Sequence, residues 1–336
     1  MNFGTLNRID AMLSKPYVLA IGAANMDLAA STTHGLALGD STPGMVRSAP
    51  GGVARNVAEN LARLGLEVCL LSPVGDDLQG RGLLERTREA GVDVDACWTL
   101  HGERTSSYVS LHGADGDMVA AINDMTILER VTPEQLAHKK DLLTHAEVFF
   151  LDCNLPEAAL EWLFLQARDR PVFVDPVSAF KCRRVLPWLG RVHTLKANRL
   201  EAQALWGQPV NSDLEIEAAA RWLHAQGVQQ VVLSLGARGL YWSAGNSRSG
   251  WQPAIPVPVV NATGAGDALM AGLLHQHLRD VPLEQAVVFS AGCAAFTLAA
   301  SQANHPGLSV AGVRHLLDSM PLSTPGPASK LPAQRL

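Results

Sequence analysis

A glycine-rich segment followed by a carboxylate lies near the end of the chain. Residues 261–267 read NATGAGD, between the apolar segment WQPAIPVPVV and the helix-like segment ALMAGLLHQHL. Gly264, Ala265 and Gly266 leave backbone N–H groups bare at the start of a predicted helix, where the helix dipole favours an anion. Asp267 stands where a Walker loop would supply a lysine. The pattern indicates either a phosphoryl site in which Asp267 takes the proton of an attacking hydroxyl, or an Asp that only caps the helix.

Polar residues that suit a sugar occur near the start of the chain. Asp27 follows the first predicted strand in the segment NMD. A carboxylate there accepts hydrogen bonds from two neighbouring sugar hydroxyls, or it forms a turn. Gly51 and Gly52 open the next predicted helix, and Asn56 lies beside the apolar stripe of that helix. The amide of Asn56 therefore faces either a ligand at the helix mouth or solvent.

Acidic residues and glycines that suit phosphates follow three later strands. Asp175, in VDPVSAFK, faces a metal or phosphates, or it forms the turn before the next element. Asn198 and Glu201 have the spacing of a capping box, and the same geometry holds a carboxylate near the water shell of a magnesium ion that carries phosphates. Gly236 and Gly239 flank a turn that either admits a nucleotide or is a plain tight turn.

Short apolar segments alternate with amphipathic ones along the chain. Because such strands favour a parallel sheet with helices on both faces, we expect the active site beyond the carboxyl ends of the strands. Strands are predicted in 17–22, 67–75, 147–154, 171–177, 192–198 and 228–236. Helices are predicted in 50–65, 80–91 and 155–169, a further helix begins at Arg199, and a final helix begins at about Asp267.

One segment departs from this alternation. Residues 105–124 contain two extended runs around the turn-rich GADGD, which predicts a hairpin that rises from the α/β body as a small lid. The last residues, 321–336, are rich in Pro and Ser and lack periodicity, so we expect a frayed tail.

The composition excludes several classes of function. The 336 residues are 47% hydrophobic, carry a formal net charge of -5 and contain no dense Lys/Arg block, so neither nucleic acid nor a membrane surface is an expected partner. No basic and apolar leader and no run of about 20 apolar residues is present, so we expect a cytoplasmic protein. The five cysteines are odd in number and widely spaced, which favours reduced, buried thiols over disulfides or zinc: Cys69, Cys97, Cys153, Cys182 and Cys293.

The segments NMD, PGG followed by R-N, N-R-L-E, S-L-G-A-R-G and T-G-A-G-D together resemble the ribokinase (PfkB) family of sugar and nucleoside kinases. Their order and spacing match over residues 17–320, after an N-terminal extension of residues 1–16. The resemblance implies a ribokinase-like α/β fold, with a Rossmann-like, mostly parallel sheet covered on both faces, and a β lid with segments near 28–48 and 105–124. It also implies ATP and Mg²⁺ as partners and phosphorylation of a primary hydroxyl.

The resemblance assigns a role to each matching residue. It makes Asp267 the catalytic base and Gly264, Ala265 and Gly266 the anion hole. The sugar would be held by Asn25, Asp27, Gly51, Gly52 and Asn56. The nucleotide would be held by Lys196, Asn198, Ser234, Gly236, Gly239 and Thr263, and magnesium, through water, by Asp175, Asn198 and Glu201.

The lid segments are closely similar to those of a nucleoside kinase within the family, which implies the ribose 5′-hydroxyl of a nucleoside as acceptor. On this likeness the base would be read, or the pocket closed, by Thr105, Ser106, Asn123, Asp124 and Lys181. Many relatives begin the terminal motif with D-T-T, whereas Asn261 and Ala262 stand here, so a carboxylate of the family's monovalent-cation site is missing and activation by K⁺ is left open. Two lids that pair through their exposed edges would form a homodimer.

Three other functions are compatible with the sequence. Another nucleoside or ribose kinase of the same family would carry the same motifs. A non-catalytic sugar- or nucleoside-binding regulator is disfavoured by the retained Asp267 and its glycines. A nicotinamide dehydrogenase is disfavoured because the first strand is followed by GAANMD and not by G-x-G-x-x-G.

Overall fold

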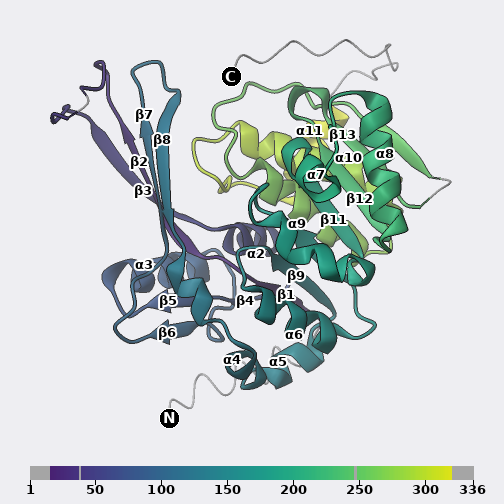
Figure 1. The fold of residues 1–336 in the computed structure, drawn as a ribbon. Helices are drawn as coiled ribbons and strands as arrows, with labels where there is room; N and C mark the ends of the chain where they lie inside the picture. The colour runs from purple at the N-terminus through teal and green to yellow at the C-terminus, as the bar shows by residue number, and fades with distance from the viewer. Residues whose placement is uncertain (1–15, 38, 246–247, 320–336) are drawn as a thin grey trace.

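A twisted sheet of eight strands forms the centre of the computed structural model, which describes residues 16–37, 39–245 and 248–319. The strand order is β14-β13-β12-β11-β10-β9-β1-β4, and the pairs from β4 to β12 are parallel whereas β13 and β14 are antiparallel (Figure 1). The strands are β1 Val18–Ile21, β4 Val68–Leu71, β9 Val148–Asp152, β10 Val172–Asp175, β11 Thr194–Asn198, β12 Gln230–Ser234, β13 Leu240–Ser243 and β14 Ser249–Gln252. The predicted extension and tail lie outside the described residues, apart from residue 16.

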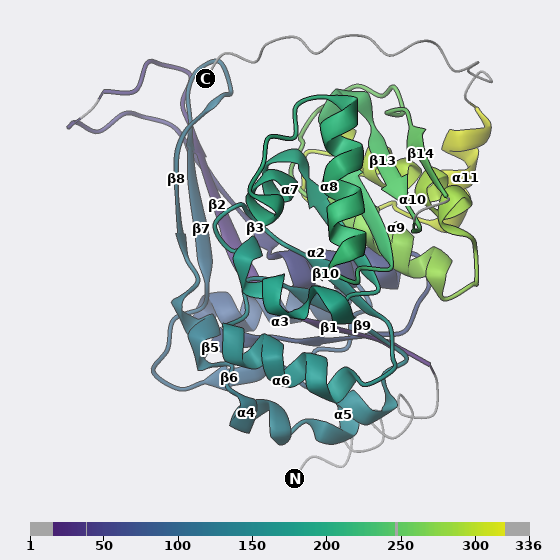
Figure 2. The same ribbon diagram turned by 45° about the vertical axis from the view of Figure 1, so that its right-hand side comes forward.

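Helices cover both faces of this sheet, as the alternation of segments predicts. On β1, Leu19 faces a core shared with one set of helices and Val18 faces the core of the other set. The first set comprises α6 Glu157–Ala167, the 3-10 helix η2 Cys182–Arg191, α7 Arg199–Trp206 and α8 Asp213–Ala225, of which α7 and α8 lie side by side in Figure 2. The second comprises α2 Val53–Arg63, α9 Ala265–His277, α10 Leu283–Leu298 and α11 Val310–Asp318. Both faces of the parallel strands are therefore buried, which explains their largely continuous apolar sequences.

A second sheet, of four strands, stands away from the α/β body at the upper left of Figure 1. We call it the lid. Its order is β3-β2-β7-β8, with β2 Asn25–Ser31, β3 Met45–Gly51, β7 Ser107–His112 and β8 Met118–Asp124. The hairpin predicted in 105–124 is confirmed, because β7 and β8 pair antiparallel.

The single strand predicted at 67–75 is wrong, because the chain leaves the main sheet at Ser72. The Oγ atom of Ser72 accepts from Ala24 N at 3.0 Å and its carbonyl accepts from Trp98 N at 3.1 Å. Beyond it, β5 Pro73–Gly75 pairs with β6 Trp98–Leu100 in a separate two-stranded sheet. The remaining elements are α3 Leu78–Glu89, η1 Thr126–Arg130, α4 Pro133–Ala137, α5 Lys140–His145 and η3 Gly236–Arg238.

The helix at the glycine-rich segment begins at Ala265, two residues before the predicted start. The sequence predicts this helix as the final one, whereas two more helices, α10 and α11, follow it in the structure. All five cysteines are free thiols, four of them buried and Cys97 half-buried, as expected. Within the described ranges, every helix is too short or too polar to cross a bilayer.

Helices α9 and α10 approach closely because Gly272 has no side chain. A Cβ at Gly272 would lie 2.7 Å from Ser290 Cα and 2.8 Å from Ser290 Oγ. We expect Gly272→Ala to lower the free energy of unfolding by about 1–3 kcal/mol, since one methyl overpacks this contact. The measurement is urea unfolding followed by circular dichroism.

Gly82 provides a matched control for that substitution. It lies inside α3 and a Cβ there would meet no atom within 4 Å. Gly82→Ala should therefore raise the free energy of unfolding, by up to about 1 kcal/mol, because alanine is the better helix former. Equal effects of the two substitutions would contradict the close approach of α9 and α10.

Candidate active site

Polar residues end three neighbouring strands of the main sheet. Asp152 ends β9, Asp175 ends β10 directly opposite it in register, and Asn198 ends β11. Asp152 was not among the predicted site residues, although the strand-ending pattern of FFLDCN is the same as that of VFVDPV. The three residues lie at the carboxyl edge of the parallel strands, the edge beyond which ligands bind in open parallel sheets.

The segment 261–267 brings the start of α9 to this edge. Gly264 is the N-cap and has a φ of 83°, and a Cβ there would collide with the carbonyl oxygen of Ala303. Only glycine fits this position. The backbone amides of Ala265 and Gly266 belong to the first turn, so they have no partner within the helix and are available to an anion.

The carboxylate of Asp267 does not cap its own helix. The start of α9 has no side-chain cap, and Asp267 Oδ2 instead accepts from Asn56 Nδ2 of α2 at 2.8 Å. Asp267 is buried, with 9% of its surface exposed. The first-turn position therefore directs the carboxylate toward the start of α2.

Lys196 of β11 places a positive charge beside the same amides. Its Nζ atom donates to Asp175 Oδ2 at 2.6 Å and lies 2.9 Å from the position that a Cβ of Gly266 would take. Burial lowers the pKa of Lys196, but the carboxylates of Asp175 and Glu201 more than offset this and raise it on balance. The Lys196 side chain therefore stays charged. A Walker loop supplies its cation from its own helix, whereas here the cation comes from strand β11.

The surroundings of Asp267 raise its pKa. Burial raises the pKa of Asp267 to about 7, the negative charge of Asp175 adds to the rise, and Lys196 and the hydrogen bond from Asn56 oppose it. A carboxyl group that titrates near neutral pH is suited to general-base work, because it is partly ionised and still basic enough to hold a proton.

The capping box predicted at the start of α7 is present. Asn198 Oδ1 accepts from Glu201 N at 2.9 Å, and Glu201 Oε2 accepts from Asn198 N at 2.8 Å. Glu201 is nevertheless buried, and its pKa is raised by burial and by the charge of Asp175. Glu201 and Asp175 are thus close enough to interact electrostatically at the carboxyl edge.

These oxygen donors fit magnesium only in its hydrated form. Among the residues that the structure describes, no group of three His, Cys, Asp or Glu side chains could hold a metal ion. Asp175 is paired with Lys196 and Glu201 with Asn198. Since Mg²⁺ keeps several waters and binds phosphates readily, two carboxylates that contact those waters are sufficient to hold the ion.

The residues predicted to bind the sugar gather between β2, β3 and α2. Asp27 Oδ1 accepts from Asn25 Nδ2 at 2.6 Å, and its carboxylate lies where a Cβ of Gly51 would be. Gly52 has a φ of 100°, and a Cβ there would meet the carbonyl oxygen of Ala23. Burial raises the pKa of Asp27, and the hydrogen bond from Asn25 opposes this. Gly51 thus leaves room for the Asp27 carboxylate against the backbone just before α2, and Gly52 allows the loop at Ala23 to approach closely.

Asp152 holds this junction together. Its carboxylate accepts from the backbone amides of Ala23 at 2.8 Å, Ala54 at 3.1 Å and Asn154 at 2.9 Å. Asp152 is fully buried, and burial raises its pKa to about 6. The Nζ atom of Lys181 donates to Asn154 Oδ1 at 2.6 Å, so the predicted Lys181 does lie at the same edge.

The structure separates the four lid residues predicted to read the base. Thr105 is buried, and its Oγ1 donates to Asp77 Oδ1 at 2.7 Å and accepts from Gly75 N at 3.0 Å, so Thr105 holds the foot of the lid. Ser106 is 2% exposed, and within the described part of the chain its Oγ has no hydrogen-bond partner. Asn123 and Asp124 are both exposed on β8.

Strand register places Asn123 and Asp124 on opposite faces of the lid. Asp27, Tyr108 and Asn123 stand opposite one another across three strands, so they share one face. Asp124, one residue on, faces the other way, and its Oδ1 accepts from Thr126 Oγ1 at 2.6 Å. Asn123 therefore lies on the face that carries Asp27.

The residues predicted to bind the nucleotide lie beside β12 and before α9. Ser234 ends β12, Gly236 has a φ of 59°, and a Cβ at Gly239 would collide with the carbonyl oxygen of Gln252. Thr263 is exposed, and its amide donates to Asn261 Oδ1 at 2.9 Å. Asn261 Nδ2 in turn donates to the carbonyl of Ser301 at 3.3 Å. Asn261 thus fastens the segment before α9 to the loop before α11.

The sequence matches a known family of kinases over most of its length. Residues 15–309 match the pfkB family of carbohydrate kinases. The chain is 44% identical to a pseudouridine kinase of Escherichia coli strain K12 over 92% of this chain and 98% of that protein. It is 41% identical to an uncharacterised sugar kinase, YeiI, of the same organism over 89% of this chain and 82% of that protein.

A solved structure shares the fold. A ribokinase of Arabidopsis thaliana complexed with ribose and ATP superposes with a TM-score of 0.81 at 22% identity, covering 91% of this chain and 99% of that one. The expected ribokinase-like α/β fold is confirmed. With the family match spanning most of the chain, this protein belongs to the PfkB family of carbohydrate kinases.

Proposed function

We propose that this kinase transfers the γ-phosphoryl group of ATP to the ribose 5′-hydroxyl of pseudouridine, giving pseudouridine 5′-phosphate and ADP. The observation that carries the chemistry is the buried carboxylate of Asp267, held beside the bare amides of the α9 N-terminus and the Lys196 ammonium. The substrate is supported by the 44% identity to a pseudouridine kinase across nearly the whole of both chains.

Asp267 orients the 5′-hydroxyl and takes its proton as the hydroxyl oxygen attacks the γ-phosphorus. A new P–O bond forms to the ribose, the bond to the β-phosphate oxygen breaks, and ADP leaves with that electron pair. The transition state is loose, so positioning and charge neutralisation are the main requirements. Burial of Asp267, which raises its pKa to about 7, makes it basic enough for this step.

The negative charge of the phosphoryl group is met by three sets of groups. The amides of Gly264, Ala265 and Gly266 point from the helix start, and the dipole of α9 reinforces them. Lys196 stands beside Gly266. Magnesium, when bound with ATP through water near Asp175 and Glu201, adds neutralisation of the β- and γ-phosphates. Asn261, which lacks a carboxylate, is engaged with Ser301 and Thr263 and gives no support for a K⁺ site.

We further propose that Asn123, and not Asp124, reads the base. Pseudouridine exposes a ring N–H that uridine lacks, because its glycosidic bond is made through carbon. Asn123 lies on the face of the lid that carries Asp27, and its Oδ1 is an acceptor for such an N–H. Closure of the lid would bring Asn123 over the base and exclude water.

The opposite face of the lid supports a homodimer. It carries Leu28, Val46, Val109, Leu111 and Ile122, of which Val46 is 70% and Ile122 74% exposed. Exposed apolar strands are usually covered. We infer that a second copy covers them, and a monomeric mass by light scattering at assay concentration would refute this.

A panel of acceptors tests the substrate. We expect kcat/KM for pseudouridine to exceed that for uridine by about 100-fold or more, since a site with a matched acceptor rejects an analogue that lacks the N–H. The panel comprises pseudouridine, uridine, ribose, inosine and fructose 6-phosphate, with ADP release as the readout. Turnover of another acceptor but not of pseudouridine would overturn the assignment of pseudouridine as the substrate.

The same panel decides between the two lid residues. Asn123→Ala should reduce the preference for pseudouridine over uridine, whereas Asp124→Ala should leave that ratio closer to the native one, because Asp124 faces away from Asp27. A larger loss of preference in Asp124→Ala would reverse the assignment.

Removal of the ionisable group tests the role of Asp267. We expect Asp267→Asn to lower kcat by about 10²- to 10⁴-fold, the range that general-base catalysis supplies. Binding of ATP, measured by calorimetry, should change little. Near-native kcat in this variant would refute the base role.

The native enzyme provides the matching pH measurement. Because only ionised Asp267 accepts a proton, kcat/KM should rise with pH and level off above the pKa of about 7. The profile should lose this limb in Asp267→Asn. A native profile that stays flat from about pH 5.5 to about pH 8 would contradict the assignment.

The second candidate is a sugar kinase with another acceptor. The 41% identity to YeiI, a sugar kinase of unspecified substrate, favours it. The catalytic carboxylate and the phosphate site would be unchanged, and the difference would lie in the lid and near Asp27. Ribose and inosine in the acceptor panel distinguish it.

A further inference from the structure

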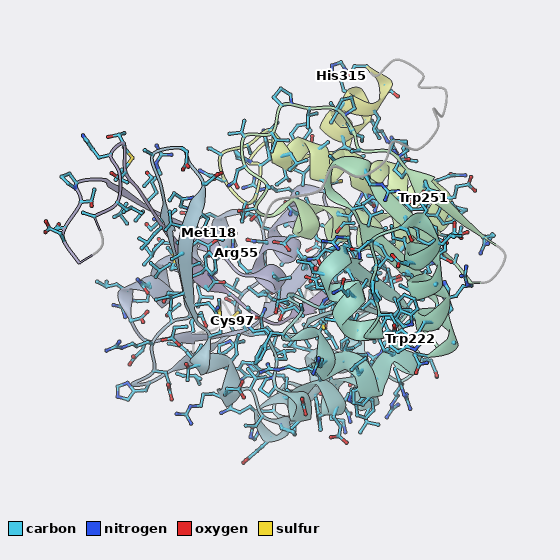
Figure 3. The ribbon with its side chains drawn as sticks, turned by 45° about the horizontal axis from the view of Figure 1, so that its top comes forward. Arg55, Cys97, Met118, Trp222, Trp251 and His315 are labelled. Atoms are coloured by element: carbon cyan, nitrogen blue, oxygen red, sulfur yellow. The ribbon has the colours of Figure 1, made fainter. Side chains whose placement is uncertain are left out.

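Arg55 of α2 stands directly behind the contact between Asn56 and Asp267. Its Nη1 atom donates to Asn56 Oδ1 at 2.9 Å, and Asn56 Nδ2 donates to Asp267 Oδ2 at 2.8 Å. The side chain, labelled in Figure 3, is only 4% exposed. A continuous chain of hydrogen bonds therefore runs from a buried guanidinium through one amide to the proposed base.

This chain determines which way the Asn56 amide points. A guanidinium can only donate and an ionised carboxylate can only accept, whereas an asparagine amide offers one acceptor and one donor atom. With Arg55 on one side, Oδ1 of Asn56 is drawn to the guanidinium and the N–H₂ group faces Asp267. Without Arg55, only the contact with Asp267 favours this orientation, so the amide loses one of the two interactions that hold it and the flipped form becomes less unfavourable.

Arg55 is itself held in place by several elements. Its Nη1 also donates to Asn304 Oδ1 at 3.0 Å, and Asn304 Nδ2 donates to the carbonyl of Asn56 at 2.9 Å. Its Nε donates to Thr87 Oγ1 of α3 at 3.2 Å, and its Nη2 pairs with Glu59. The loop before α11, helix α3 and α2 itself thus fix the guanidinium.

We propose that Arg55 is a positioning residue for phosphoryl transfer, which orients the Asn56 amide so that Asp267 is held toward the acceptor hydroxyl. The proposal rests on the proposed role of Asp267 as base. Burial lowers the pKa of Arg55 to about 10, so the guanidinium remains charged at neutral pH. Arg55 therefore acts through Asn56 and does not itself touch the substrate.

A purely structural role is the alternative, because buried ion pairs such as Arg55 with Glu59 are costly to break. The two roles separate in kinetics. A misdirected base lowers kcat at constant KM, while a structural defect lowers stability and the amount of active enzyme. A loss of orientation equivalent to about 1 Å costs up to about 100-fold in rate.

The surface beside Arg55 allows a direct rescue experiment. A cavity of about 390 Å³ is lined by Arg55, Glu59, Arg63, Asn304 and residues of the lid foot and α3. In Arg55→Ala, a free guanidinium ion can enter through this cavity and replace the missing group. We expect kcat of Arg55→Ala to fall about 10- to 100-fold with both KM values within about threefold of native.

Guanidinium chloride at non-denaturing concentration should then restore most of the lost kcat, compared with sodium chloride at equal ionic strength, because the free ion supplies the missing hydrogen-bond donors. Arg55→Lys, which retains one charge but not the forked donors, should stay impaired and guards against a variant that fails to fold. Arg170→Met is the matched control. Arg170 donates to the carbonyl of Thr144 at 3.0 Å, far from the site, so its loss should lower Tm without lowering kcat or responding to guanidinium.

Each result decides between the two roles. A folded Arg55→Ala with native kcat, or one whose lost kcat guanidinium does not restore, would overturn the proposal. Failure of the base assignment is recognised separately, because Asp267→Asn would then retain activity. Both assignments stand if guanidinium restores the activity of Arg55→Ala but does not restore that of an inactive Asp267→Asn.

Discussion

The crowding of negative charge at one buried edge of the sheet is the constraint on which the site depends. Asp152, Asp175 and Asp267 converge there, and each raises the pKa of another or has its own pKa raised by burial. Charges of one sign at low dielectric repel strongly, so the arrangement requires compensation. Lys196 and the amide of Asn56 supply it. This balance leaves Asp267 with a pKa of about 7.

Backbone geometry turns this balance into a binding site. Gly264 bends the chain tightly enough to bring the start of α9 against Ala303, and Gly266 leaves room for the Lys196 ammonium. A side chain at either position would displace the amides or the cation. The proposed anion site is therefore formed by the absence of side chains at the start of α9 and by the presence of the Lys196 side chain from β11.

The two sheets divide the remaining work. The main sheet, with a buried core on each face, fixes the ends of β9, β10 and β11. The lid has two different faces, one carrying Asp27, Tyr108 and Asn123 and the other carrying apolar side chains. The foot of the lid is tied to the body through Thr105 and Asp77. The edge that carries the proposed base and the projecting lid are thus joined at the foot of the lid.

Local patterns in the sequence by themselves determined the alternation of strands and helices, the hairpin at 105–124, the capping box of Asn198 and Glu201, and the placing of Asp267 after bare amides. Such features depend on residues a few positions apart. The tertiary structure alone decided the partners across the site. Asn56 and Asp267 are 211 residues apart, Arg55 reaches Asn304, Lys196 fills the space that Gly266 leaves, and Asp152 binds two loops. These contacts depend on how helices pack on a sheet, so neither propensity nor spacing along the chain contains them.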